Sequence, residues 1–276
     1  MANDPVPAIT EAEATGETAE IFADLRDTLG VNVVNLVWRH IATFPGALAW
    51  AWATLRPIYV SGAVGLEARR LRSELVTPAL SVWPGSALRC VEVDATSEAT
   101  IRRVLASYNR SNALNLVALS ALVRHIDGAP FSATASGVAP ASPPERAVEG
   151  SMPRLLALDE VTKDTADLIL KINLLADRHH GRIVASMYRH LAHWPGFLAL
   201  CYAQLAPLAA DGSIAHMIES ALTLADHAGA RLQGQLTATP RPENVANIRQ
   251  ASVEFIEQAI GKMVPIAKLI EASLAT

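Results

Sequence analysis

Apolar residues recur at three- and four-residue intervals along most of this chain of 276 residues. In segment 17–29, Ile21, Leu25 and Leu29 stand four residues apart, which places them on one face of a helix. The same periodicity predicts further helices over 31–43, 47–60, 66–82 and 98–126. Only segment 88–96 has a pattern that suggests a strand, so we predict an all-α fold.

Residues typical of helix ends stand between these periodic segments. Thr15 precedes the first segment and is of a residue type that caps helix N-termini. The pairs Pro45-Gly46 and Pro195-Gly196 each separate two periodic stretches. Because proline suits the first turn of a helix and glycine suits its end, each pair is expected to end one helix and begin the next.

Three blocks of the first half recur in the same order in the second half. The matching blocks are 14–25 with 161–172, 38–59 with 188–209, and 101–109 with 248–256. Self-similarity of this kind indicates a duplicated structural unit. We therefore predict two tandem helical repeats of roughly 120 residues each, packed as an intramolecular pseudo-dimer about a near-twofold axis.

This duplication also predicts the domain boundaries. The N-terminal repeat is expected at 1–126 and the C-terminal repeat at 154–276. Between them, 127–153 is rich in Pro, Gly, Ala and Ser, a composition that favours an extended linker over a packed element.

Composition and charge narrow the class of protein. A net charge of −4 provides no basic surface for nucleic acid, and no run of about 18 apolar residues predicts a membrane span. The N-terminus lacks the basic and apolar regions of a signal peptide, and Cys90 and Cys201 stand far apart in the sequence. We expect a cytoplasmic protein with buried thiols that acts on a small molecule, without membrane or nucleic-acid partners; the sequence is also compatible with a homodimer.

An asymmetric site between two repeats can arise only where their sequences differ. Just upstream of the Arg-His pairs, Asn35 and Leu36 of the first repeat correspond to Ala185 and Ser186 of the second, and Met187 follows.

A second difference lies in segment 98–126. Asn109, Asn112 and Asn115 stand three residues apart on one face of an otherwise apolar helix. Buried amides must be paired or face a pocket. These three asparagines therefore either line a pocket or form hydrogen bonds between helices, and the sequence leaves both interpretations open.

These features together resemble the group I 2-haloacid dehalogenases, the family that accepts both D- and L-substrates. The resemblance lies in the duplicated Arg-His-x-Ala-x-x-Pro-Gly block, the long Asn-bearing helix and the linker, and it covers nearly the whole chain. It implies an all-α pseudo-dimer with the active site between the repeats. It also implies displacement of halide by an Asp-activated water, without a covalent ester and without a cofactor. In that mechanism an Asn helps hold the water, and an aromatic pair with a Ser hydroxyl receives the halide.

The resemblance assigns roles to individual residues unevenly. The family's Asn corresponds to Asn112, which is the implied catalytic residue, while the family's catalytic Asp falls on Met187. A thioether cannot take a proton from water, so the family mechanism cannot run unaltered with this residue. The aromatic halide ligands fall on Val33 and Leu36, and a pocket Tyr falls on Asn115. The substrate-binding set is accordingly expected to be Val33, Asn35, Leu36, Asn115, Ala185, Ser186 and Met187.

Other polar residues have the chemistry of a base or a ligand. Asp177, His179 and His180 precede the pocket helix of the second repeat, and either a replacement base or a solvated helix start fits them. Glu67 fits either an important acid or a solvent-facing side chain.

The histidines near the repeated block have their own alternatives. His190 and His193, three residues apart, could share a metal, but no third ligand accompanies them, and packing at the repeat interface suits them better, so we expect no metal. Two functions stay open: a dehalogenase-like hydrolase of a small organic acid, and a diverged homologue that binds or converts a different small molecule.

Overall fold

The computed structural model describes residues 6–129, 150–177, 183–237 and 240–274, and it is all-α as predicted. The first half contains α1 (Gly16–Leu29), α2 (Leu36–Ile41), α3 (Ala47–Val60), α4 (Ala63–Glu74), α5 (Gly85–Cys90) and α6 (Ala95–Asp127). The second half contains α7 (Lys163–Asn173), α8 (Ser186–Leu191), α9 (Pro195–Ala210), α10 (Ser213–Leu232), α11 (Val245–Phe255) and α12 (Gly261–Ser273). Short 3₁₀ turns form at Leu158–Glu160 and Gln233–Gln235, and a π-helical turn at Ile256–Ile260 joins α11 to α12.

Two expectations about local structure are wrong. Segment 88–96 is not a strand but contains the end of α5, a turn at Glu92 with φ 61°, and the start of α6, which Asp94 caps by accepting from Ser97 N at 2.7 Å. The helix expected over 66–82 begins at Ala63 and ends at Glu74. Pro78 disfavours helical geometry at the residue before it, which periodicity alone does not reveal.

The helix ends expected from the sequence agree more closely with the structure. The first helix begins directly after Thr15, although the Thr15 side chain makes no capping hydrogen bond. Near Pro45-Gly46, α2 gives way to α3, and near Pro195-Gly196, α8 gives way to α9. Each proline–glycine pair therefore stands where one helix gives way to the next, as predicted, although Pro195 and Gly196 are themselves the first residues of α9.

The two halves present corresponding helices in the same order. The short helix that carries Arg-His begins at Leu36 in the first half and at Ser186 in the second. Gly62 and Gly212 each precede the fourth helix of their half in a left-handed conformation, with φ 78° and 86°. The near-twofold relation and the domain boundaries stay predictions.

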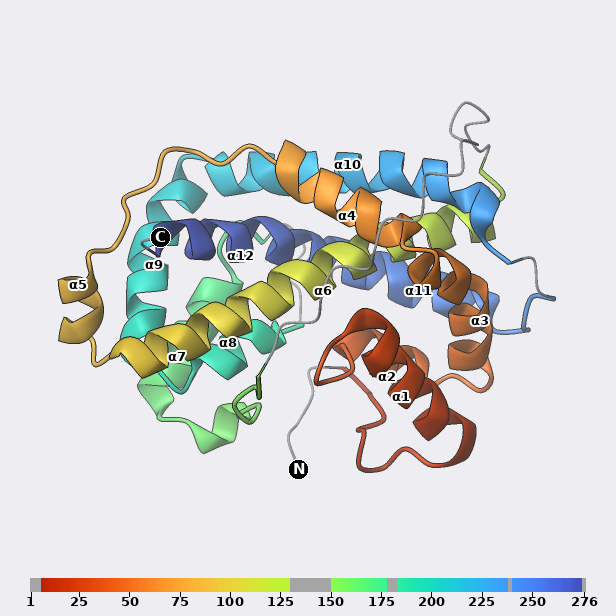
Figure 1. Cartoon of the computed structure of the whole chain (residues 1–276), viewed down its shortest axis with the longest axis horizontal. Coiled ribbons are helices and arrows are strands. Elements are labelled where there is room, and N and C mark those ends of the chain that lie inside the picture. Colours follow the sequence, from red (N-terminus) through yellow and green to blue (C-terminus); the bar gives the residue numbers. More distant parts are fainter. Residues whose placement is uncertain (1–5, 130–149, 178–182, 238–239, 275–276) are drawn as a thin grey trace.

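The long helix α6 is the element around which both halves pack. It lies against α4 of its own half and against α10, α11 and α12 of the other, and α12 runs beside it (Figure 1). Gly229 on α10 permits a close approach, since a Cβ there would lie 2.9 Å from Ala121 N on α6. The site described below lies along this interface.

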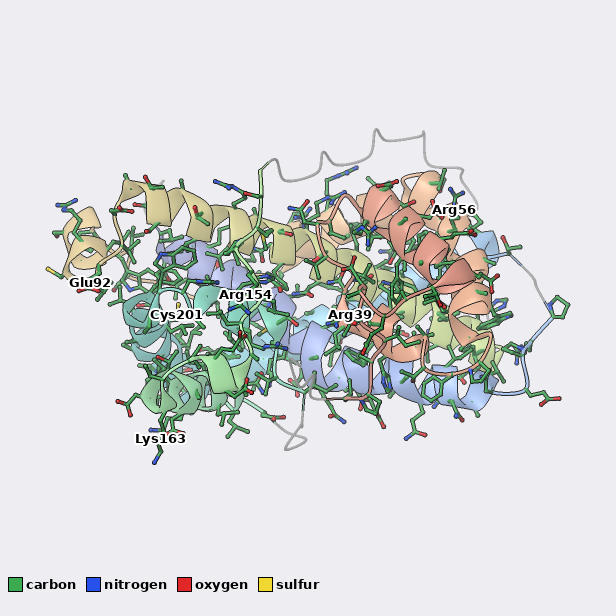
Figure 2. All side chains as sticks on the ribbon, turned by 90° about the horizontal axis from the view of Figure 1, so that it is seen from below. Arg39, Arg56, Glu92, Arg154, Lys163 and Cys201 are labelled. Carbon is green, nitrogen blue, oxygen red and sulfur yellow. The ribbon has the colours of Figure 1, made fainter. Side chains whose placement is uncertain are left out.

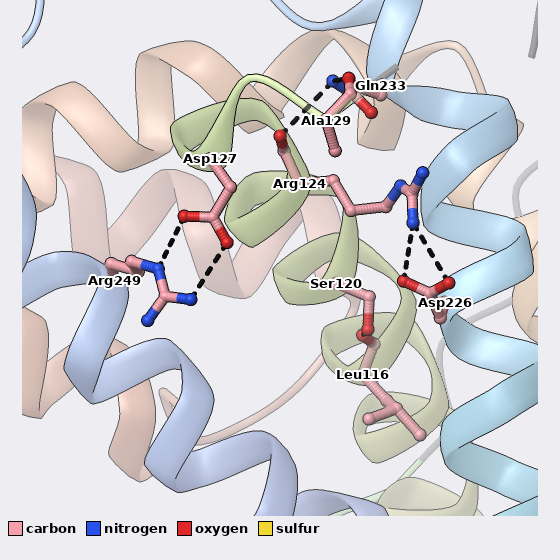
Figure 3. Close-up of polar contacts among 8 residues, drawn as sticks. All are labelled: Leu116, Ser120, Arg124, Asp127, Ala129, Asp226, Gln233 and Arg249. Atoms are coloured by element: carbon pink, nitrogen blue, oxygen red, sulfur yellow. Dashed lines mark hydrogen bonds and ion pairs between the residues drawn. The ribbon is translucent and has the colours of Figure 1, made fainter. Parts of the chain in front are cut away.

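Ion pairs fasten the C-terminal end of α6 to the second half. Arg124 pairs with Asp226 of α10 at 2.9 Å, and Asp127 pairs with Arg249 of α11 at 2.6 Å (Figure 3). Each pair has at least one side chain that is more than a third exposed, so their individual contributions to stability are small.

The environment of the two cysteines differs from the expectation. Cys201 is buried inside the second half, but Cys90 is exposed at the end of α5, near Glu92 at the outer end of the molecule (Figure 2).

Among the described residues, no single helix is long and apolar enough to cross a membrane. Only the bent pair of α9 and α10 has the necessary length and composition, when both helices are counted together.

Glu67 is not the solvent-facing residue that its sequence context suggests. It is buried on α4 and accepts two hydrogen bonds from Arg231 of α10, Nε to Oε1 at 2.9 Å and Nη2 to Oε2 at 2.5 Å. This pair joins the two halves across their interface.

We expect Glu67→Gln to lower the free energy of unfolding by about 2 kcal/mol, because it leaves the Arg231 guanidinium partly buried without its carboxylate. Glu74→Gln is the matched control, since Glu74 pairs with Arg70 on the same helix but both side chains are about half exposed. That control should change stability by no more than about 0.5 kcal/mol. Equal effects of the two substitutions in urea unfolding would contradict a structural role for the Glu67 pair.

Candidate functional site

A small pocket of about 50 Å³ lies between the two halves, where the N-terminal ends of α2 and α8 meet α6 and the α11–α12 junction. We call it the inter-half pocket. Its lining residues come from both halves and are mostly apolar: Asn35, Leu36, Val37, Tyr108, Asn112, Ile183, Val184, Ala185, Ser186, Met187, Phe255, Ala259, Ile260 and Met263. A pocket of this size has room for about three to five waters or one small molecule.

The π-helical turn shapes one wall of this pocket. Phe255, Ala259 and Ile260 all lie at the turn, where the Gly261 N–H donates to Ile256 O five residues back. A Cβ at position 261 would lie 2.5 Å from that carbonyl, so the turn requires glycine here. Such turns change the direction in which successive side chains point, and they occur often at functional sites.

Asn173 fixes the opposite wall, the segment from Ile183 to Ala185. Its Nδ2 donates to Ile183 O at 3.1 Å, and its Oδ1 accepts from Ala185 N at 3.2 Å. The Asn173 carbonyl in turn accepts from Lys262 Nζ at 2.5 Å, and Asp177 lies 3.9 Å from the same ammonium. Burial lowers the pKa of Lys262, and Asp177 partly offsets that effect.

Because of these contacts, Asp177 does not fit the role of replacement base that its position in the sequence allows. Its carboxylate is buried against Lys262 and does not line the inter-half pocket. His179 and His180 lie outside the described residues.

Of the three asparagines of α6, two form hydrogen bonds to other helices and one lines the pocket. Asn109 Nδ2 donates to Glu271 Oε2 on α12 at 2.5 Å, and Asn115 Oδ1 accepts from Trp38 Nε1 and Tyr59 OH, both at 3.0 Å. Asn112 lines the pocket instead, and its buried Nδ2 has no partner within the described part of the chain. Asn112 therefore presents an unpaired donor to whatever occupies the pocket.

The other predicted site residues are also divided. Asn35, Leu36, Ala185, Ser186 and Met187 line the inter-half pocket with Asn112. Two predicted residues do not line it: Val33 is 39% exposed, and Asn115 is fully buried behind the pocket wall. Counting only the residues that the structure describes, the Oδ1 of Asn35 is buried without a partner, as are the Nδ2 atoms of Asn112 and Asn115.

The described residues that line this pocket include no carboxylate and no imidazole. Met187 occupies the position assigned to the base and is fully buried. Tyr108 is the one lining side chain with an ionisable group, and burial raises its pKa above the usual value of a phenol. A proton acceptor must therefore act from beyond the lining residues.

A neighbouring pocket, also of about 50 Å³, shares Asn35, Leu36, Tyr108 and Ser186 with the first. It adds polar side chains that the inter-half pocket lacks, among them Arg39 and His190. Val33 lies here as well.

Tyr108 connects the two pockets to His190. Its hydroxyl lies 2.7 Å from His190 Nδ1, and Ser186 lines both pockets beside it. Burial and the neighbouring His193 and Arg189 lower the pKa of His190 to about 4, so its imidazole is neutral at pH 7. Neither residue was in the predicted site set, although Tyr108 was a visible signal because its counterpart in the other repeat is Phe255.

The arginines of the repeated block, and His193 beside the second of them, contact backbone carbonyls. Arg39 Nε donates to Val34 O at 3.2 Å, and Arg189 Nε donates to Leu156 O at 2.7 Å. His193 Nε2 lies 2.8 Å from Arg154 O. Within the ranges that the structure describes, no three His, Cys, Asp or Glu side chains gather as metal ligands.

Comparison with known proteins gives consistent relatives. No protein-family model matches the chain. A configuration-inverting 2-haloacid dehalogenase from Alcaligenes xylosoxydans xylosoxydans is 29% identical over 213 residues, which cover 74% of this chain and 69% of the relative. Among solved structures, a D-2-haloacid dehalogenase in complex with L-LA has a TM-score of 0.73 at 18% identity, covering 99% of this chain and 97% of that one. A mutant of such an enzyme with D-2-CPA has a TM-score of 0.72 at 19% identity, covering 99% and 98%. At this identity the structural likeness concerns the fold.

The lowered pKa of His190 has a consequence for stability. An unfolded chain binds a proton at this imidazole below about pH 6.5, whereas the folded protein binds it only near pH 4, so acid favours unfolding in that range. We expect the loss of unfolding free energy between pH 7.5 and pH 5 to be smaller in His190→Gln than in the wild type, by about 2 kcal/mol. Urea unfolding at both pH values measures this difference. An identical loss in the two proteins would show that the imidazole is not held neutral by burial.

Proposed function

Since the chain belongs to the 2-haloacid dehalogenase family and is a dehalogenase-like hydrolase, we propose that it binds a small organic acid in the inter-half pocket. There a water held by Asn112 attacks the substrate carbon directly, with Met187 in the place of the family's base. The observation that carries this proposal is the unpaired, buried amide of Asn112 in a pocket built from both halves.

Asn112 suits this role because its amide is already desolvated. An unpaired buried donor costs free energy until a ligand or water accepts its hydrogen bond. Ser186 contributes a hydroxyl to the same pocket, while Ile183, Val184 and Phe255 provide an apolar surface for a short alkyl chain. The volume and the lining together favour a small acid.

The proposal includes no cofactor, because displacement by water needs only an oriented nucleophile and an acceptor for its proton. It also retains two repeats, at 1–126 and 154–276, as the source of the two pocket walls. The residues proposed for substrate binding are those that line the pocket: Asn35, Leu36, Ala185, Ser186 and Met187. The other two residues of the expected substrate-binding set, Val33 and Asn115, do not line this pocket.

An alternative function has its own support. Met187 and Leu36 make this part of the pocket apolar and leave it without a carboxylate or an aromatic halide ligand. A diverged homologue that binds or converts a different small molecule also fits these substitutions.

We expect halide release from 2-chloropropionate to be slow in the wild type and faster by roughly 10²-fold or more in Met187→Asp, because general-base assistance contributes about that much or more. The gain will be partial if burial keeps the new carboxyl protonated near neutral pH. Halide release measured with each enantiomer tests this. Rapid dehalogenation by the wild type would show that another residue is the base, and no gain in Met187→Asp would count against the proposed register.

Within the Met187→Asp background, Asn112→Ala should lower halide release by about tenfold or more, because the attacking water loses its donor. Asn109→Ala is the matched control, since Asn109 lies one turn away on α6 and is as deeply buried but bonds to α12. That control should reduce stability with little effect on the rate. Equal losses of rate in both variants would remove Asn112 from the mechanism.

A further inference from the structure

We propose that Ser186, Tyr108 and His190 form a proton relay that accepts the proton of the water attacking in the inter-half pocket. This inference rests on the proposed function, because it supplies the proton acceptor that Met187 cannot. It gives catalytic roles to two residues, Tyr108 and His190, that the resemblance to the family did not assign.

The three side chains form a continuous path between the two pockets. Ser186 and Tyr108 line both pockets, and His190 lines the neighbouring one. The Tyr108 hydroxyl lies 2.7 Å from His190 Nδ1, and on the pocket side the neighbouring Ser186 hydroxyl acts to lower the pKa of Tyr108. The path therefore leads from the proposed reaction site to an imidazole outside it.

The second repeat's histidine has a counterpart that makes no such path. His40, which corresponds to His190, packs on Phe255 with ring centroids 5.7 Å apart, while His190 packs on Tyr108 at 5.6 Å. Each histidine thus contacts the equivalent aromatic ring on the long helical segment of the opposite half. Ring packing explains both contacts, but only the Tyr108 side has a hydroxyl that can carry a proton.

The relay uses the neutral tautomer of His190 that carries its hydrogen on Nε2, an atom that is buried without a partner among the described residues. In this tautomer Nδ1, which lies 2.7 Å from the Tyr108 hydroxyl, accepts from the phenol.

Several charged or titratable groups face His190. They are Arg189 and His193 on its own segment, and Arg39, which together with Arg189 acts electrostatically on Tyr108. Burial is the main cause that makes a protonated His190 unfavourable at rest, and His193 and Arg189 add to it, so the imidazole is neutral and able to accept. A carboxylate substrate bound nearby adds the negative charge that stabilises the imidazolium as it forms.

The chemical step balances as follows. The water oxygen forms a bond to C2 of the 2-haloacid, and the carbon–halogen bond breaks with its electron pair on the halide. The proton released by the water passes to Ser186 Oγ, the Ser186 hydroxyl proton passes to Tyr108, and the Tyr108 proton passes to His190 Nδ1. The imidazolium then loses a proton to solvent through the neighbouring pocket, and all three side chains return to their starting state.

Other buried groups near the interface have partners that occupy them. Asp177 lies against Lys262, and Glu67 is held by both nitrogens of the Arg231 fork. Neither carboxylate lines the inter-half pocket or its neighbour. His190 is the basic side chain linked to the pocket through its hydrogen bond with Tyr108.

The experiment compares Tyr108→Phe and His190→Gln in the wild-type and the Met187→Asp backgrounds. Halide release from 2-bromopropionate is measured with each enantiomer, and circular dichroism checks that each variant is folded. Tyr108→Phe recreates the His–Phe pair that the other half already contains, and glutamine at 190 keeps a hydrogen-bonding group but cannot act as the base. In the wild-type background we expect either substitution to lower the rate by about tenfold or more.

The Met187→Asp background separates a relay from a structural role. There the new carboxylate takes the proton, so the same two substitutions should change the rate by less than about twofold. Equal losses in both backgrounds would overturn the relay in favour of packing. A wild type with no halide release above the uncatalysed rate would overturn the relay too, while an active Met187→Asp would leave the proposed function standing. Inactivity of Met187→Asp as well would count against the proposed function itself.

A pH profile gives a second readout. Neutral His190 accepts the proton and the imidazolium does not, so the wild-type rate should be level near pH 7 and fall as the pH drops through about 4. His190→Gln should lack this dependence in whatever rate remains. A wild-type profile with no fall in that range would contradict the assignment of His190 as the acceptor.

Discussion

The buried polar face of α6 is the constraint on which the rest of the site depends. An amide enclosed by both halves of the protein must find a partner or face a pocket, because an unpaired buried donor is costly. Asn109 donates to a group on α12, and Asn115 Oδ1 accepts from groups on α2 and α3, so these bonds fix α6 against its neighbours. The Nδ2 of Asn115 is buried without a partner among the described residues, but it does not line the pocket. Asn112 alone of the three opens onto the inter-half pocket. The place of Asn112 in the pocket wall is thus set by the bonds that hold Asn109 and Asn115 on the same helix.

The sequence predicts much of the fold because local signals agree with the final packing. The helix expected over 47–60 has those bounds in the structure, and Gly46 and Gly62 next to it both adopt left-handed conformations that end the preceding chain segments. Where the signal depends on a single residue, prediction is weaker. Pro78 interrupts an apolar pattern that otherwise continues to residue 82, so the predicted helix was too long.

The sequence predicts site residues correctly where the position of a residue within a helix determines the direction of its side chain. The register of Arg39 and Arg189 identifies the residues at the start of α2 and α8, and most of these line the pocket. Val33 lies before α2 in a non-helical segment, where register does not determine the direction of a side chain, and it points toward the neighbouring pocket. The contact between Tyr108 and His190 joins positions 82 residues apart across the interface, and no local pattern contains that information. The difference between Tyr108 and Phe255 was the available signal.

A ligand-bound crystal structure tests the central claim, that Asn112 presents a donor to a small acid in the inter-half pocket. The protein would be crystallised with lactate, a 2-hydroxy acid of the size that the pocket accepts. The account predicts lactate between the two halves, with Asn112 Nδ2 donating to one of its oxygens at about 3 Å and Ser186 in contact with it. Lactate bound elsewhere, or an inter-half pocket left without it at saturating concentration, would contradict the account.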